Sequence, residues 1–112
     1  MRKRKVKIEV KYKVWLEKDG EIIMGQGREL LLKYIDETGS ILHASKMLNI
    51  SYRKALHYIR AMEERLGKKL VESQRGGYTR GGSTLTEDAK KLLKHYENIV
   101  KEFEKLKSKL EK

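Results

Sequence analysis

The chain has 112 residues, 38% of them hydrophobic, which suits one small domain with a modest core. Its 27 Lys and Arg against 16 Asp and Glu give a net charge of +11, which favours a polyanionic partner such as nucleic acid or an anionic membrane surface, although solubility alone would also explain it. The absence of cysteine excludes disulfides, thiolate zinc sites and a cysteine nucleophile. No apolar run reaches the roughly 18 residues of a membrane span, and the basic start MRKRK precedes no signal-peptide segment, so we expect a cytoplasmic protein.

Hydrophobic and polar residues alternate over positions 6–16, and only Trp15 breaks the polar side. This period of two predicts a half-buried strand over 6–16. Asp19-Gly20 then predicts a type I′ turn into EIIM, completing a hairpin. The lysines on the outer face would protect a sheet edge or, equally well, lie near DNA.

A helical period follows in RELLLKYIDETG, with Gly39 as its expected C-terminal residue. Gly25 and Gly27 lack the third glycine of a dinucleotide fingerprint, because Leu30 occupies that place, and no P-loop lysine follows. We interpret the two glycines as a joint between strand and helix.

Two further helices are separated only by Asn49-Ile50-Ser51, which predicts a helix-turn-helix unit. Ser40 is the expected N-cap of ILHASKMLN and Ser51 that of YRKALHYIRAMEERL, which ends at Gly67. The inward residues of the second helix are expected to be Ala55, Tyr58 or Ile59, Met62 and Leu66, and the outward ones Arg53, Lys54, His57, Arg60 and Glu64.

The segment RGGYTRGG, positions 75–82, has four glycines and two arginines between the β-prone runs KLVES and STLT. An ordinary solvated hairpin would explain it in isolation. After a helix-turn-helix, however, it matches the wing of a winged helix-turn-helix, in which glycines allow close backbone approach and arginines meet phosphates or a narrow minor groove.

Within that interpretation the N-terminal part of the second helix enters a major groove. The candidate DNA-binding residues are Ser51, Tyr52, Arg53, Lys54, His57, Arg75, Tyr78 and Arg80. Each has a plainer alternative. Ser51 is expected to cap its helix in any case, Tyr52 and Tyr78 would otherwise pack, and Lys54 and His57 would otherwise be solvated surface.

The last helix begins after Thr86, a good N-cap followed by two acidic residues. Apolar residues follow a 4-3-4-3 spacing from Leu85 to Leu110, the pattern of a coiled-coil seam. The first half can be buried within one small domain, whereas the part beyond about Ile99 favours a homodimer. The predicted dimerisation residues are Leu92, Tyr96, Ile99, Phe103, Leu106 and Leu110. We thus expect a DNA-binding domain over 1–85 and a dimerisation helix over 86–112.

Catalysis finds little support in the sequence. His43, His57 and His95 have no metal-site spacing, and no nucleophile elbow is present. The glutamates lie on helices beside lysines, which suits surface pairs. We therefore expect no enzyme activity, no metal and no cofactor.

The segments GSI, MLNISYRKA, AMEERLG, LVES and GG…GG…LT together resemble the DNA-binding domain of ModE-type molybdenum-dependent transcriptional regulators, over about positions 25–95. They are more distantly similar to the LysR-type N-terminal domain. The resemblance implies a dimeric winged-helix protein on a roughly palindromic operator, with a recognition helix starting at Ser51 and a wing over 75–82. Molybdate-sensing relatives carry a further C-terminal region, which this sequence, ending at Lys112, does not contain; the effector is left open.

The sequence therefore predicts an α+β protein: a winged helix-turn-helix with an N-terminal β-hairpin and a long C-terminal dimerisation helix. The expected function is sequence-specific regulation of transcription on double-stranded DNA. Two alternatives stay open: an architectural protein that coats DNA without reading bases, and an adaptor whose last helix recruits a partner. Single-stranded nucleic acid is disfavoured, because aromatic residues make up only 7% of the chain.

Overall fold

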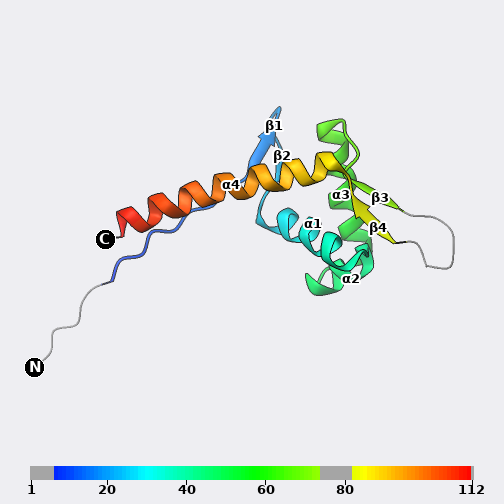
Figure 1. Cartoon of the computed structure of the whole chain (residues 1–112), viewed down its shortest axis with the longest axis horizontal. Helices are drawn as coiled ribbons and strands as arrows, with labels where there is room; N and C mark the ends of the chain where they lie inside the picture. The colour runs from blue at the N-terminus through cyan, green and yellow to red at the C-terminus, as the bar shows by residue number, and fades with distance from the viewer. Residues whose placement is uncertain (1–6, 74–81, 112) are drawn as a thin grey trace, which may run out of the picture.

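A computed structural model describes residues 7–73 and 82–111. In chain order the elements are β1 (Leu16–Lys18), β2 (Glu21–Met24), α1 (Gln26–Thr38), α2 (Ile41–Met47), α3 (Tyr52–Leu66), β3 (Val71–Ser73), β4 (Ser83–Leu85) and α4 (Glu87–Leu110). Strands β1 and β2 form one antiparallel pair and β3 and β4 another (Figure 1). The α+β class and the winged-helix order of elements are those expected from the sequence.

The turn of the first hairpin is as predicted. Asp19 and Gly20 have φ values of 51° and 80°, the two positive angles that a type I′ turn needs. The predicted strand over 6–16, however, is wrong in extent, because β1 begins only at Leu16 and residues 7–15 belong to no strand.

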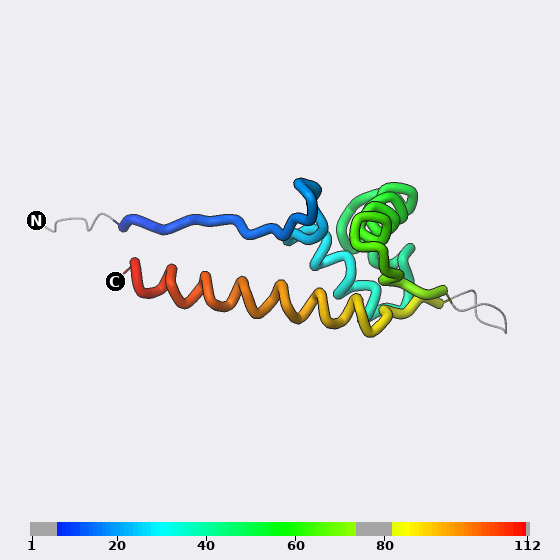
Figure 2. Tube along the Cα trace, turned by 90° about the horizontal axis from the view of Figure 1, so that it is seen from above, coloured from blue at the N-terminus to red at the C-terminus, as the bar shows by residue number. Residues whose placement is uncertain are grey.

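Residues 7–15 instead run extended beside α4 (Figure 2). The Tyr96 hydroxyl donates to the Val14 carbonyl at 2.8 Å, and the Val10 N–H donates to the Glu111 carboxylate at 2.8 Å. Val10, Tyr12 and Val14 are half-buried, whereas the residues between them are exposed. The alternation thus correctly indicated an extended segment with one covered face, but a helix covers that face rather than a neighbouring strand.

Tyr12 anchors the middle of this segment. Its ring stacks on that of Phe103, with centroids 5.8 Å apart, and its hydroxyl donates to the Glu104 carboxylate. That hydrogen bond, with the nearby negative charge, raises the pKa of Tyr12 to about 12.

The core forms around α1, of which Leu31, Leu32 and Ile35 are fully buried. This helix contacts α2, α4, β2 and β4. It ends at Gly39, which has φ 70° as a left-handed C-cap residue requires. The Gly39 carbonyl then accepts from the Ser83 N–H at 2.8 Å, which fixes β4 at the end of α1.

Helix α4 has a buried half and an exposed half. Thr86 accepts from the Ala89 N–H at 3.1 Å, as a capping residue should, and Ala89, Leu93 and Tyr96 are buried. Further along the helix, three apolar residues stay largely exposed: Phe103 (44%), Leu106 (48%) and Leu110 (62%). Within residues 7–73 and 82–111 no helix is long and apolar enough to cross a membrane.

One glutamate connects α3 to β3. The Glu63 carboxylate accepts from the backbone N–H groups of Leu70 (2.8 Å) and Val71 (3.2 Å), both buried residues. The sequence pattern gave only the general expectation of surface ion pairs for glutamates, which is correct for Glu87 and Glu102, each paired with the lysine three residues on. Glu63 instead holds the strand that leads into residues 74–81.

Replacing Glu63 with Ala should lower the free energy of unfolding by about 1–3 kcal/mol, because two largely buried N–H groups lose a charged acceptor. Urea denaturation measures this value. Glu64→Ala is the matched control, since Glu64 is exposed and forms no hydrogen bond within the described residues. Equal effects of the two substitutions would contradict this role of Glu63.

Candidate nucleic-acid interface

The helix-turn-helix unit consists of α2, the turn Leu48–Ser51 and α3. The turn is held from both sides: the Ile50 N–H donates to the Ser45 carbonyl at 3.0 Å, and Asn49 takes the left-handed conformation with φ 58°. Asparagine adopts this conformation more easily than most residues. Ser45 is itself buried, its hydroxyl donating to the Leu42 carbonyl at 2.7 Å.

Both helices begin with the expected serine caps. Ser40 accepts from the His43 N–H at 3.0 Å, and Ser51 accepts from the Lys54 N–H at 3.0 Å. Ser51 therefore caps α3, the role expected of it whatever else it contacts.

Helix α3 divides into the two predicted faces. Ala55, Ile59 and Met62 are buried, while Tyr58 and Leu66 are partly buried. The opposite side is exposed and carries Tyr52, Arg53, Lys54, His57, Arg60 and Glu64.

The exposed face of α3 is predominantly cationic. No acidic residue lies in its first turn, and Arg53, Lys54 and Arg60 take part in no ion pair within the described residues. The Lys54 ammonium lies 5.9 Å from the centroid of the Tyr58 ring. Tyr52 is 47% exposed, so its side chain is not part of the core. This surface presents donors and positive charge to solvent, the features that contact phosphates and base edges.

The β3–β4 hairpin follows α3, with Val71 opposite Leu85 and Ser73 opposite Ser83. In Figure 1 the hairpin and the C-terminal end of α4 point in opposite directions. The predicted wing residues Arg75, Tyr78 and Arg80 lie outside the described residues. The strands that would carry a wing are present, and the roles of those three residues stay predictions.

Sequence reasoning did not single out the exposed side of α2. Leu42, His43, Lys46 and Met47 are all exposed there, with Leu42 at 46% and Met47 at 52%. The signal was available in the helical spacing, because the buried residues Ile41, Ala44 and Ser45 leave these four on the other side. The first helix of such a unit crosses the DNA backbone in known complexes, which makes Lys46 a further candidate contact.

Of the predicted dimerisation residues, two pack within the chain's own core. Tyr96 is only 3% exposed, and Leu92 packs against the same buried cluster. Ile99 is half-buried, and Phe103, Leu106 and Leu110 are exposed.

In the part of the chain that the structure describes, no three His, Asp or Glu side chains are grouped so that they could hold a metal ion.

The order of elements, and the exposed face of α3 as the second helix of the helix-turn-helix unit, define a winged helix-turn-helix protein. The family model for bacterial regulatory helix-turn-helix proteins of the lysR family matches residues 30–90, more than half of the chain. The chain belongs to this family.

Curated relatives point in the same direction. The chain is 39% identical over 70 residues to the transcriptional regulator ModE of Haemophilus influenzae, covering 62% of this chain and 28% of that protein. It is 37% identical over 89 residues to the molybdenum-pterin-binding protein MopB of Rhodobacter capsulatus, covering 80% of this chain and 33% of the relative. It thus spans a third or less of these relatives, and the similarity confirms the ModE-type resemblance for the DNA-binding region.

Two solved structures share the fold. DarR of Vibrio fischeri, determined in complex with DNA, has a TM-score of 0.50 and 20% identity, covering 75% of this chain and 26% of DarR. The zinc-responsive MarR family member ZitR of Lactococcus lactis has a TM-score of 0.51 and 19% identity, covering 83% of this chain and 68% of ZitR.

Proposed function

We propose that this chain binds specific sequences of double-stranded DNA as a transcriptional regulator. The observation that carries the proposal is the exposed cationic face of α3, whose opposite face is fixed in the core by Ala55, Ile59 and Met62. A rigidly held helix with exposed Arg53, Lys54 and His57 can enter a major groove and keep its register there. Membership of a family of regulatory helix-turn-helix proteins supports the same function.

In this proposal Arg53 reads a base or holds a phosphate, while Lys54 and the wing residues Arg75 and Arg80 contact the backbone. Tyr52, His57 and Tyr78 are further candidate contacts. A cytoplasmic location follows from the proposed function. Binding of molybdenum-pterin, the property in the name of MopB, is not part of the proposal, because the chain spans only 33% of that relative.

The competing function is non-specific DNA coating, which the charge of +11 would serve equally well. Fluorescence anisotropy separates the two, using the duplex upstream of the protein's own gene, a scrambled duplex and several salt concentrations. A regulator should prefer its site by about a thousandfold or more. Equal, steeply salt-sensitive binding to both duplexes, and no enriched motif after selection from random DNA, would establish the coating function instead.

Arg53→Ala should weaken binding to the selected site by about 1–3 kcal/mol and relax the base preference at one position. The same anisotropy assay, repeated with single-base variants of the site, measures both effects. Lys94→Ala is the control for charge, because Lys94 is exposed and lies on α4, outside the helix-turn-helix unit. If the two variants bind alike, α3 does not dock as proposed.

We further propose that the chain acts as a homodimer through the outer half of α4, on a roughly palindromic operator. The support comes from an arm made of that half-helix and residues 7–14, which run side by side (Figure 2). Apolar residues of the arm remain exposed, including Phe103, Leu106, Leu110 and Ile8, the last at 78%. The division into a DNA-binding part, 1–85, and a dimerisation helix, 86–112, belongs to this proposal, although the start of α4 also packs in the core.

Changing both Ile99 and Phe103 to Glu should give monomers, because charges would then occupy the centre of the proposed seam. Light scattering with size-exclusion chromatography measures the mass. Lys101→Glu, an exposed residue between them, is the control and should leave the dimer intact. A dimer that persists in the double variant would place the seam elsewhere.

A further inference from the structure

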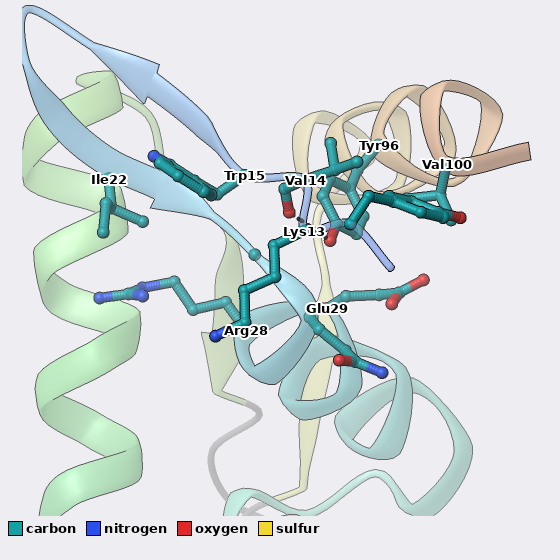
Figure 3. A pocket seen from close by; sticks show the side chains of 11 residues that line it. Lys13, Val14, Trp15, Ile22, Arg28, Glu29, Tyr96 and Val100 are labelled. Carbon is teal, nitrogen blue, oxygen red and sulfur yellow. Dashed lines mark hydrogen bonds between the residues drawn. The ribbon is translucent and has the colours of Figure 1, made fainter. Parts of the chain in front are cut away.

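A cavity of about 420 Å³ lies where the N-terminal segment, the start of α1 and the middle of α4 meet (Figure 3). Its walls include Trp15, Ile22, Arg28, Glu29, Tyr96 and Val100. This volume falls in the range of about 300–1,000 Å³ that small-molecule sites occupy. None of its lining residues belongs to α2 or α3, so the function proposed above gives the cavity no role.

Trp15 gives the cavity an aromatic wall. It is the residue that breaks the polar side of the alternation at 6–16, it is the single tryptophan of the chain, and it is 52% exposed. Its indole N–H donates to the Glu17 carboxylate at 2.7 Å, which orients the ring. A Cβ added at Gly25 would lie 3.6 Å from the Trp15 Cβ, an ordinary van der Waals contact. A large apolar ring held in place at the rim of a cavity suits contact with a flat apolar ligand.

Arg28 gives the cavity a cation. Its guanidinium lies 4.9 Å from the Tyr58 ring centroid, but within the described residues it forms no ion pair, and its Nε is buried without a hydrogen-bond partner. Burial, followed by the charge of Arg65, lowers the pKa of Arg28. A partly desolvated guanidinium costs free energy unless an acceptor compensates it. Lys13 also lines the cavity and adds a second positive charge.

Glu29 limits the charge of an occupant. In Figure 3 its side chain points to the side opposite that of Arg28, toward Tyr96. Burial and then the neighbouring Glu97 raise the pKa of the Glu29 carboxyl. One carboxylate at this end disfavours a multiply charged anion, whereas a single negative charge near Arg28 and Lys13 is favoured.

We propose that this cavity binds a small aromatic carboxylate, with its ring against Trp15 and Ile22 and its carboxylate held by Arg28 and Lys13. The terminal nitrogens of Arg28 would bind the carboxylate, since its Nε is enclosed. The inference concerns ligand binding alone, and it stands or fails independently of the DNA-binding proposal.

The test is titration of the full chain with phenylacetate. Binding is measured by calorimetry and by the fluorescence of Trp15, the single tryptophan of the chain and part of the cavity wall. Phenylacetate should bind and change the fluorescence. Its neutral isostere phenylacetamide should bind about tenfold or more weakly, as expected for the loss of one ionic contact. Equal binding of the two would overturn recognition of the charge, and tighter binding of sulfate or molybdate would overturn the aromatic class.

Substitutions of the lining residues test whether phenylacetate binds in the cavity. Arg28→Met keeps the aliphatic stem and should lose about tenfold or more in affinity, and Lys13→Met, at an exposed position that cannot disturb the core, should lose several-fold. Lys91→Met removes one charge from the exposed side of α4 and is the control. Phenylacetate affinity that is the same in all three variants, each shown folded by circular dichroism, would overturn the proposal.

Discussion

Burial of α1 is the constraint on which the rest of the structure depends. Leu31, Leu32 and Ile35 have no exposed surface, and full burial of such a side chain contributes about 1.5–3 kcal/mol. The same helix contacts α2, β2, β4 and α4. The α2–α3 unit, the β3–β4 hairpin and α4 are thus positioned against one another through α1, although α1 is not part of the helix-turn-helix unit.

Features that depend on neighbouring residues were predictable from the sequence. The caps Ser40, Ser51 and Thr86 and the Asp19-Gly20 turn each involve residues within four positions, and all formed as expected. The two faces of α3 follow from helical spacing alone. What covers an extended segment does not, because a period of two indicates one buried face and carries no information on the partner. The alternation therefore predicts a strand over residues 7–15, whereas a helix some 80 to 100 positions away in the sequence covers them.

The contacts that sequence reasoning missed cross from one element to the next or depend on a missing partner. Glu63 resembles any surface glutamate until the chain entering β3 brings the Leu70 and Val71 N–H groups to its carboxylate. Arg28 resembles any helical arginine until folding encloses its Nε without an acceptor. Trp15 alone gave a signal, as the one apolar residue on a lysine-rich side, and the cavity that it lines supplies a reason for that exception.

The distribution of ion pairs separates two kinds of basic surface. On α4, three of the seven lysines, Lys90, Lys105 and Lys107, pair with glutamates one turn away, so part of the charge on that helix is locally balanced. On α3, Arg53, Lys54 and Arg60 have no such partners within the described residues, and Glu64 is the one acidic residue on the exposed face. Exposed pairs contribute little to stability, so the difference between the helices matters mainly for the field each presents to solvent. An unbalanced cationic face costs free energy through self-repulsion, and a bound polyanion would relieve that cost. Helix α3 therefore holds only part of the chain's positive charge, but on its exposed face that part is left without local pairs among the described residues.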